Sequence, residues 1–75
     1  MRRTITGTED LRKFVKEQRK KMKLTQLEFS EDIGMTQTTL CHIERGSTRI
    51  QLATVLKILD GLGYRMVIEE AGNDE

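Results

Sequence analysis

The segment between Thr25 and Gly46 constrains the fold of this chain more than any other part of the sequence. Thr25 and Glu28 form a T-x-x-E capping box, which is a signal for the start of a helix. Thr36 is a preferred N-cap residue for a second helix. Gly34, shortly before it, favours a tight turn because glycine adopts conformations that other residues avoid. The segment therefore predicts two short helices joined by a turn.

The polarity of these two predicted helices separates an inner from an outer side. The apolar residues that suit one shared core are Phe29, Ile33, Leu40 and Ile43. The outward positions of the second helix carry Gln37, Thr38 and His42. Such polar side chains can hydrogen-bond the edges of DNA bases. A helix, a glycine turn and a second helix with a polar outer side are typical of the helix-turn-helix motif, which places its second helix in the major groove of DNA.

Length and cysteine content bound the class of protein. At 75 residues the chain makes one domain, and a core of this size is only marginally stable, for which dimerisation is one common remedy. No run of 18 apolar residues could cross a membrane, and residues 1–10 lack the apolar segment of a signal peptide. Cys41 is the only cysteine, which excludes an internal disulfide and suits a reducing compartment. We therefore expect a cytoplasmic protein with no membrane partner.

The formal net charge of +1 hides an asymmetry along the chain. Residues 1–23 hold nine Lys and Arg against three Asp and Glu, whereas residues 24–75 hold four against nine. Charge gathered on one side of a molecule acts locally, so this distribution permits a nucleic-acid partner without demanding one. The alternative is that the basic run is the solvated side of the first helix.

Two further helices flank the central pair. Thr8 is a suitable N-cap residue for the first of them. The four helices are predicted over residues 8–22, 26–32, 37–44 and 51–61. Glycine commonly ends a helix in the left-handed conformation, and the glycines predicted to end the third and fourth helices are Gly46, Gly61 and Gly63. Helical spacing predicts that the buried stripes of the two flanking helices consist of Leu11, Phe14, Val15, Met22, Leu52, Val55, Leu56, Leu59 and Leu62.

The C-terminal part of the chain changes to a period of two. Tyr64, Met66 and Ile68 alternate with their neighbours over residues 64–70, a pattern typical of a β-strand. A lone strand leaves its backbone donors and acceptors unpaired, so we expect the same strand of a second copy to pair with it and make a homodimer. The alternatives are pairing with residues 3–6 of the same chain, or an unpaired tail that docks only Tyr64 and Met66.

The predicted fold is all-α, a bundle of about four helices with a short C-terminal β-strand that pairs across a dimer. Its parts are an N-terminal arm at residues 1–7, a DNA-binding domain at 8–63, a dimerisation strand at 64–70 and a disordered acidic tail at 71–75. Helical periodicity over most of the chain is the basis for this fold class.

Several short sequence motifs within residues 11–68 carry a family resemblance. They are Leu24-Thr25-Gln26, Phe29-Ser30, Ile33-Gly34-Met35 and Ile43-Glu44-Arg45-Gly46. Any one of them alone is weak, but their combination at this spacing is specific. The chain resembles the helix-turn-helix domains of the Cro and phage-repressor type, the XRE family, which implies a lambda-repressor-like fold. The ending from Leu59 to Ile68 is similar to that of the HipB-type antitoxins, a subgroup of this family.

The resemblance implies a role for each polar residue of the motif. It implies that base edges are read by Gln37, Thr38 and His42. It implies backbone or supporting contacts by Thr25, Gln26, Thr39, Arg45, Thr48 and Arg49. Of these, Gln26 would also buttress the reading helix, and Thr39 would reach a base or a phosphate. Arg19 and Glu44 match a family ion pair that ties the first helix to the end of the third.

The chemistry of these side chains agrees with the implied roles. Gln37 can bond adenine at N6 and N7, Thr38 can contact a thymine methyl group, and His42 can donate to guanine or to a phosphate. Arg45 and Arg49 can fork onto phosphates, which fixes the register without carrying sequence information. For each residue the alternative is a solvated side chain on a structural helix or loop. His42 is the only histidine, so neither a zinc site nor a triad can be built from several of them.

These features predict a dimeric, sequence-specific transcriptional repressor that binds double-stranded DNA at an inverted repeat. The HipB-type ending implies an antitoxin that represses its own operon and binds a HipA-like kinase toxin. The alternative is a protein-interaction module whose main role is to neutralise or assemble with a partner, with DNA binding secondary. We expect no enzyme, no cofactor and no metal site, because the sequence lacks paired catalytic carboxylates, a glycine-rich phosphate loop and a cluster of metal ligands.

Overall fold

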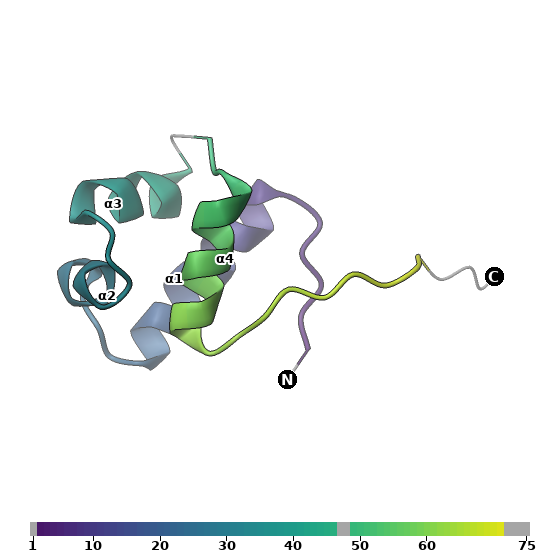
Figure 1. Cartoon of the computed structure of the whole chain (residues 1–75), viewed down its shortest axis with the longest axis horizontal. Coiled ribbons are helices and arrows are strands. Elements are labelled where there is room, and N and C mark those ends of the chain that lie inside the picture. The colour runs from purple at the N-terminus through teal and green to yellow at the C-terminus, as the bar shows by residue number, and fades with distance from the viewer. Residues whose placement is uncertain (1, 47–48, 72–75) are drawn as a thin grey trace.

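The computed structural model describes residues 2–46 and 49–71, and over these residues the chain forms a bundle of four helices (Figure 1). The helices are α1 (Thr8–Lys21), α2 (Gln26–Asp32), α3 (Gln37–Arg45) and α4 (Leu52–Leu62). α1 packs against both α3 and α4, and α2 packs against α3. The predicted all-α class is therefore confirmed, and each predicted helix is correct to within one residue at either end. None of the helices in this part of the chain is long and apolar enough to cross a membrane.

The starts of α2 and α3 have the caps that the sequence predicts. The Thr25 hydroxyl accepts from the Glu28 backbone N–H at 3.1 Å, and the Glu28 carboxylate accepts from the Thr25 backbone N–H at 2.8 Å. This reciprocal pair is a complete capping box. The Thr36 hydroxyl accepts from the backbone N–H of Thr39 at 3.1 Å and so caps α3. Both helices therefore begin where local hydrogen bonding, rather than packing, requires them to begin.

Two glycines in the left-handed region set the turns around α3. Gly34 has φ 70° and lies in the turn between α2 and α3. Gly46 has φ 74° and is the C-cap of α3, with its N–H donating to the carbonyl of Ile43 at 3.1 Å. A side chain is strained in this conformation, so the predicted roles of both glycines are confirmed.

The start of α1 differs from the prediction. The N-cap is Gly7, which has extended backbone and no side-chain cap, while Thr8 is the first residue inside the helix. The cap predicted at Thr8 was therefore wrong. The polar contacts involve Thr6, one residue before the N-cap: Asp10 accepts from the backbone N–H of Thr6 at 3.1 Å and from its hydroxyl at 2.6 Å. The bonds from Thr6 hold the pKa of the Asp10 carboxyl below its ordinary value.

The core lies where the four helices meet. Its buried apolar residues are Phe14, Val15, Phe29, Leu40, Ile43, Val55, Ile58, Leu59 and Leu62. Most of these were predicted, but Ile58 was not. The predicted core members Met22, Leu52 and Leu56 are wrong, since they are 46%, 62% and 45% exposed. The last two lie one turn apart on the flank of the apolar stripe of α4, where the chain itself provides no facing helix.

Gly61 has a packing role instead of the predicted helix-ending role. It lies inside α4, and the helix ends at Gly63, which has φ 84°. A Cβ atom at Gly61 would lie 2.3 Å from Cγ2 of Ile33. Only glycine therefore allows α4 to approach the end of α2 this closely.

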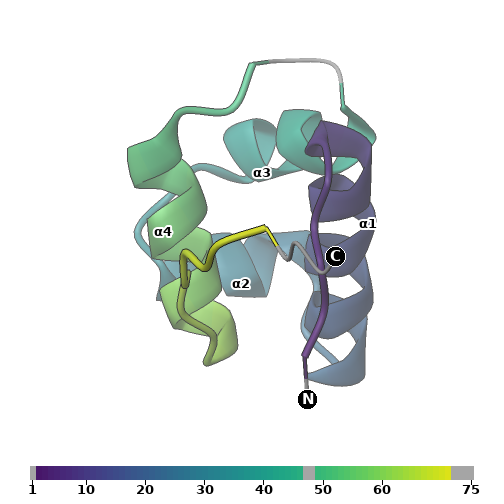
Figure 2. The ribbon, with the colours of Figure 1, turned by 90° about the vertical axis from the view of Figure 1, so that its right-hand side faces the viewer.

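The N-terminal arm runs back along α1 (Figure 2). The guanidinium of Arg3 lies 5.2 Å from the ring centre of Phe14 and donates to Glu17 at 3.2 Å. Arg2 donates to the carboxylate of Glu69 at 2.7 Å, which joins the arm to the C-terminal segment. The arm is thus held between α1 and the C-terminal segment by exposed contacts, which are individually weak.

The C-terminal segment, residues 64–71, leaves the bundle as extended chain without an assigned strand. Its first residue is anchored, because the Tyr64 ring packs edge-to-face on Phe14 with ring centres 5.0 Å apart, and its hydroxyl donates to Gln18 at 3.2 Å. Further along, the apolar side chains project into solvent, and Ile68 is 93% exposed. Strand pairing across a dimer stays a prediction. The predicted acidic tail, apart from Ala71, lies outside the described residues.

Candidate nucleic-acid interface

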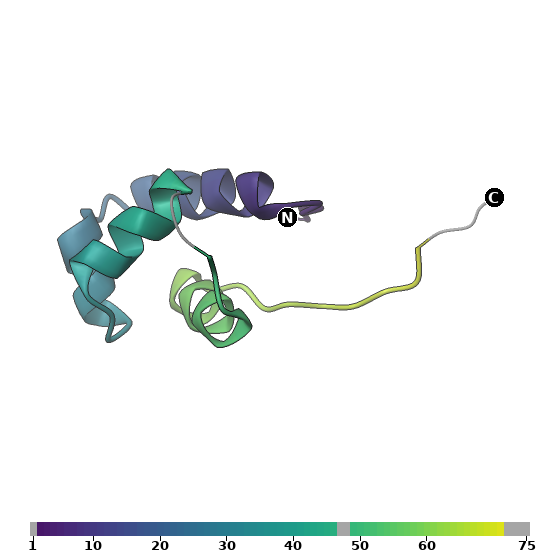
Figure 3. The same cartoon turned by 90° about the horizontal axis from the view of Figure 1, so that it is seen from above.

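The outer side of α3 is exposed and polar. Seen from above, no other helix covers it (Figure 3). Its exposed residues are Gln37, Thr38, Thr39, His42 and Arg45. The hydroxyl of Thr39 is engaged with that of Thr36 at 2.8 Å, at the capped start of the helix. All three side chains that were predicted to read bases therefore share one exposed helix surface with two of the predicted backbone contacts.

Glu44 holds α3 on the rest of the bundle. Arg19 of α1 donates from Nε to Glu44 Oε2 at 2.7 Å and from Nη2 to Oε1 at 2.9 Å. The side chains of this pair are only 8% and 2% exposed. A bidentate pair fixes orientation as well as distance, so the position of α3 relative to α1 is strictly defined.

Gln26 adds α2 to the same cluster. Its side-chain amide donates to Glu44 Oε1 at 3.1 Å, which is the buttress that the family resemblance implies. Arg19 also donates to the carbonyl of Leu24 at 2.6 Å, just before α2 starts. One carboxylate therefore joins three helices, and a phosphate contact by Gln26 remains a proposal.

The two predicted phosphate-binding arginines lie in the last turn of α3 and in the loop that follows it. Arg45 is exposed in the last turn of α3, with its guanidinium 3.8 Å from the Cys41 sulfur. Arg49 is exposed before α4, while Thr48 lies outside the described residues. A shallow open depression between α3 and α4 is lined by Thr39, His42, Ile43, Arg49, Ile50, Gln51 and Thr54. Gln51, the N-cap of α4, makes no side-chain capping bond. The depression therefore contains both the Arg49 guanidinium and the uncapped N-terminus of α4, and both attract anions.

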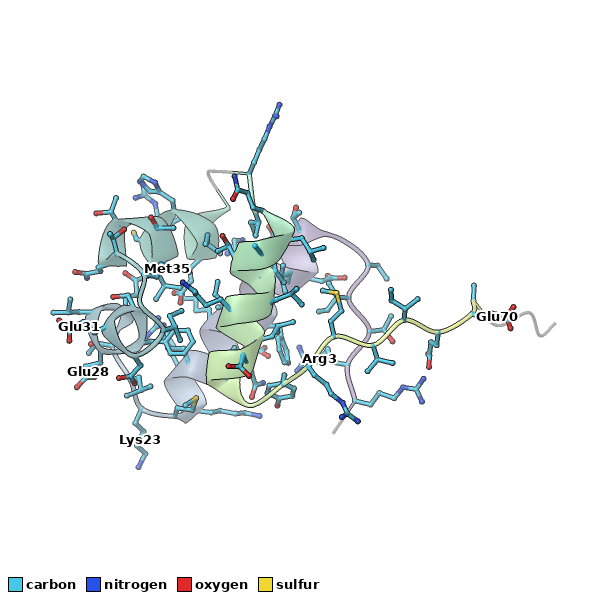
Figure 4. The ribbon with its side chains drawn as sticks, viewed as in Figure 1. Arg3, Lys23, Glu28, Glu31, Met35 and Glu70 are labelled. Carbon is cyan, nitrogen blue, oxygen red and sulfur yellow. The ribbon has the colours of Figure 1, made fainter. Side chains whose placement is uncertain are left out.

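The basic end of α1 lies apart from this surface. Lys23 follows α1 with φ 61°, and Figure 4 shows its side chain pointing away from α3. Arg3, also labelled there, lies against Phe14 and Glu17 of α1 instead. Neither residue therefore lies on the exposed polar surface of α3.

One residue at this site was missed in the sequence. Arg12 of α1 donates from Nη1 to the backbone carbonyl of Glu44 at 2.9 Å. The available signal was spacing, because Arg12 and Arg19 are seven residues apart and so lie on the same side of a helix. Nothing in the sequence identified a backbone carbonyl as the acceptor.

Comparison with known proteins agrees with this geometry. Residues 15–68 match the Helix-turn-helix family, so the chain belongs to that family, in its XRE type. No curated protein matches the chain.

Solved structures of HipB are similar over almost the whole chain. In the HipB–O2 20mer complex the HipB chain is 28% identical with a TM-score of 0.84, and the match covers 96% of this chain and 100% of that one. The HipB–O4 20mer complex gives 28% identity and a TM-score of 0.83, over 95% and 100% of the two chains. A chain of the HipA–HipB–O2–O3 complex gives 27% identity and a TM-score of 0.83, also over 95% and 100%.

Proposed function

We propose that this chain is a sequence-specific repressor that binds double-stranded DNA at an inverted repeat as a homodimer. The observation that carries the proposal is the exposed polar side of α3, held rigidly from behind by the buried Arg19–Glu44 pair. A reading helix needs this combination, because base contacts discriminate only when the helix cannot shift. Similarity to HipB chains in complexes with O2 and O4 20mers supports the same conclusion.

The proposed division of labour follows position on α3. Gln37 and Thr38, in the first turn, enter the major groove and read bases, and His42 reads one turn further along. Phosphates on either side are held by Thr25, Gln26, Thr39, Arg45, Thr48 and Arg49. The phosphate contacts set the register of the helix in the groove, and the base contacts supply sequence preference.

A second copy of the chain is the proposed partner of the exposed apolar side chains. These are Met66, Val67 and Ile68 of the C-terminal segment and Leu52 and Leu56 of α4, each at least 45% exposed. Their burial would add apolar area to a core that is too small to give one chain more than marginal stability. A two-fold axis there would place two reading helices about one DNA turn apart, roughly 34 Å, to match an inverted repeat.

The biological setting proposed is a toxin–antitoxin operon. The similar HipB chain occurs in a HipA–HipB–O2–O3 complex, which supports a HipA-like kinase toxin as the protein partner of this chain. The chain would then be a cytoplasmic antitoxin that represses its own operon. Membership of the Helix-turn-helix family supports a binding protein rather than an enzyme.

Selection of bound fragments from a random DNA pool at physiological salt tests the proposal. Enrichment of an inverted repeat with half-sites about one turn apart would support a dimeric, sequence-specific repressor. Weak binding without enrichment, sensitive only to salt, would contradict it and favour a protein-interaction module in which DNA contact is secondary.

A further inference from the structure

Arg12 connects α1 to the last residues of α3. Its Nη1 donates to the Glu44 carbonyl at 2.9 Å, and its Nε donates to Glu9 Oε1 at 3.1 Å, while Nη2 contacts the same Glu9 carboxylate. The side chain is only 20% exposed. The carbonyls in the last turn of a helix have no partner within the helix, so Arg12 supplies one of them with a charged donor.

The aliphatic part of Arg12 covers Gly46. A Cβ atom on Gly46 would lie 3.0 Å from Arg12 Cδ and 3.2 Å from Nε. The backbone of Gly46 therefore lies directly against the arginine side chain, at the point where the chain turns out of α3 with φ 74°. Arg12 thus contacts both the last turn of the reading helix and the residue that redirects the chain toward Arg49.

Two arginines of α1 therefore bind two different groups of Glu44. Arg19 binds its carboxylate and Arg12 binds its backbone carbonyl. The first contact orients the helix as a whole, whereas the second acts on its final turn. All three guanidinium nitrogens of Arg12 have protein partners, which hold the side chain against Glu9 and the end of α3.

We propose that Arg12 is a positioning residue for DNA binding, which holds the end of α3 and Gly46 so that Arg45 and Arg49 face phosphates. This inference rests on the proposed function. Arg12 acts through the two phosphate-binding arginines, so its loss weakens binding to every DNA sequence and leaves the base preference of Gln37, at the opposite end of α3, unchanged.

A double-mutant cycle on the full chain tests the proposal. The variants are Arg12→Ala, Arg49→Ala and their combination, with dissociation constants measured on the selected inverted repeat over a series of salt concentrations. Lys13→Ala is the matched control, because Lys13 also carries one charge on α1 near Glu9, at 4.0 Å, but is 65% exposed. Thermal unfolding of each variant sets a temperature at which all of them are folded.

The expected loss for Arg12→Ala is about tenfold in affinity, the equivalent of one charge-assisted hydrogen bond. The slope of affinity against salt should fall by about one contact per half-site. In the Arg49→Ala background the same change should have a smaller effect, since one of the two arginines that it positions is already gone. Arg12→Lys should restore part of the affinity and slope, because one amine can still donate to the Glu44 carbonyl. Full additivity of the two changes, or a loss equal to that of Lys13→Ala, would overturn the proposal.

A second measurement separates this inference from the proposed function. Amide hydrogen exchange at Gly46, whose N–H bonds the carbonyl of Ile43, should accelerate in Arg12→Ala while amides of α2 stay protected. Faster exchange at Gly46 in a protein whose wild type shows no DNA preference would contradict the repressor proposal but retain the structural role of Arg12. Unchanged exchange at Gly46 would overturn the positioning role, whatever the wild type binds.

Discussion

The motif segment, residues 25–46, and the C-terminal segment, residues 64–71, both carry regular sequence patterns, but only the first pattern is satisfied inside the chain. In the motif segment the caps, the buried apolar residues and the carboxylate of Glu44 all have partners in the four-helix bundle. The C-terminal segment anchors Tyr64 and then exposes an apolar run that ends near Ile68. The first segment thus has its partners within the chain, whereas the apolar run of the second segment is exposed.

Removing the C-terminal segment beyond its anchor should have the largest effect. Deletion of residues 66–75 keeps Tyr64 on Phe14 but removes the exposed apolar run. We expect a folded monomer, and an operator affinity lower by about a hundredfold to ten-thousandfold because two linked half-site contacts become one. Analytical ultracentrifugation and operator titration measure both effects. Deletion of residues 72–75 alone is the control, and a shorter chain that still sediments as a dimer would place the dimer contact elsewhere.

The reverse outcome is expected for the motif segment, where Arg19→Ala should damage folding. The change leaves the Glu44 carboxylate buried without its cation, and breaking one partner of such a pair costs about 3–5 kcal/mol in the free energy of unfolding. Urea unfolding followed by circular dichroism gives the value. Lys20→Ala, at the adjacent exposed position, should stay within about 0.5 kcal/mol of the wild type. A similar small change for Arg19→Ala would mean that the pair does not hold α3.

The close approach of α4 to α2 gives a smaller effect of a different origin. Gly61→Ala introduces a methyl group 2.3 Å from Cγ2 of Ile33, so we expect a destabilisation of about 1–3 kcal/mol by overpacking. Helix propensity alone would predict a gain of about 1 kcal/mol, so the sign of the change decides between the two effects. Adding Ile33→Ala removes the clashing atom and should make the double variant less unstable than additivity predicts. Strict additivity would exclude the clash as the cause.

The smallest expected effect concerns base reading by Gln37. Gln37→Ala should lower affinity for the selected site by about 1–3 kcal/mol and relax the preference at one base pair. Competition titrations against sites that vary at each position measure this change. Glu31→Ala, on the exposed side of α2 (Figure 4), is the control and should leave the preference unaltered. An equal loss on all DNA sequences would mean that Gln37 contacts the backbone instead.

Local signals explain why the helices could be predicted to within one residue. Caps and glycine turns act over three or four residues, so the hydrogen bonds of Thr25, Thr36 and Gly46 depend little on the rest of the fold. The predictions failed where a distant segment decides the outcome. Leu52 lies on the flank of a helix that has no facing neighbour in the single chain, and Gly61 is glycine because Ile33 packs on it.

The candidate site divides in the same way. The exposed polar residues of α3 could be predicted, since a short helix with an apolar inner side must turn the other residues outward. The support beneath them was only partly visible. Arg19 and Glu44 were paired through the family resemblance. The bond from Arg12 goes to a backbone carbonyl, which every residue type has, so the sequence does not indicate this bond.

The sequence by itself determined the helices, their caps and turns, and the polar outer side of α3, because each depends on interactions between residues close in the chain. Tertiary structure alone decided that Arg12 reaches the backbone carbonyl of Glu44, and that α4 passes close enough to Ile33 to require glycine. Those contacts join residues on different helices, where distance and direction are set by how the helices pack. The physical reason is that side-chain pattern specifies which side of a helix is buried, but only packing specifies what lies opposite.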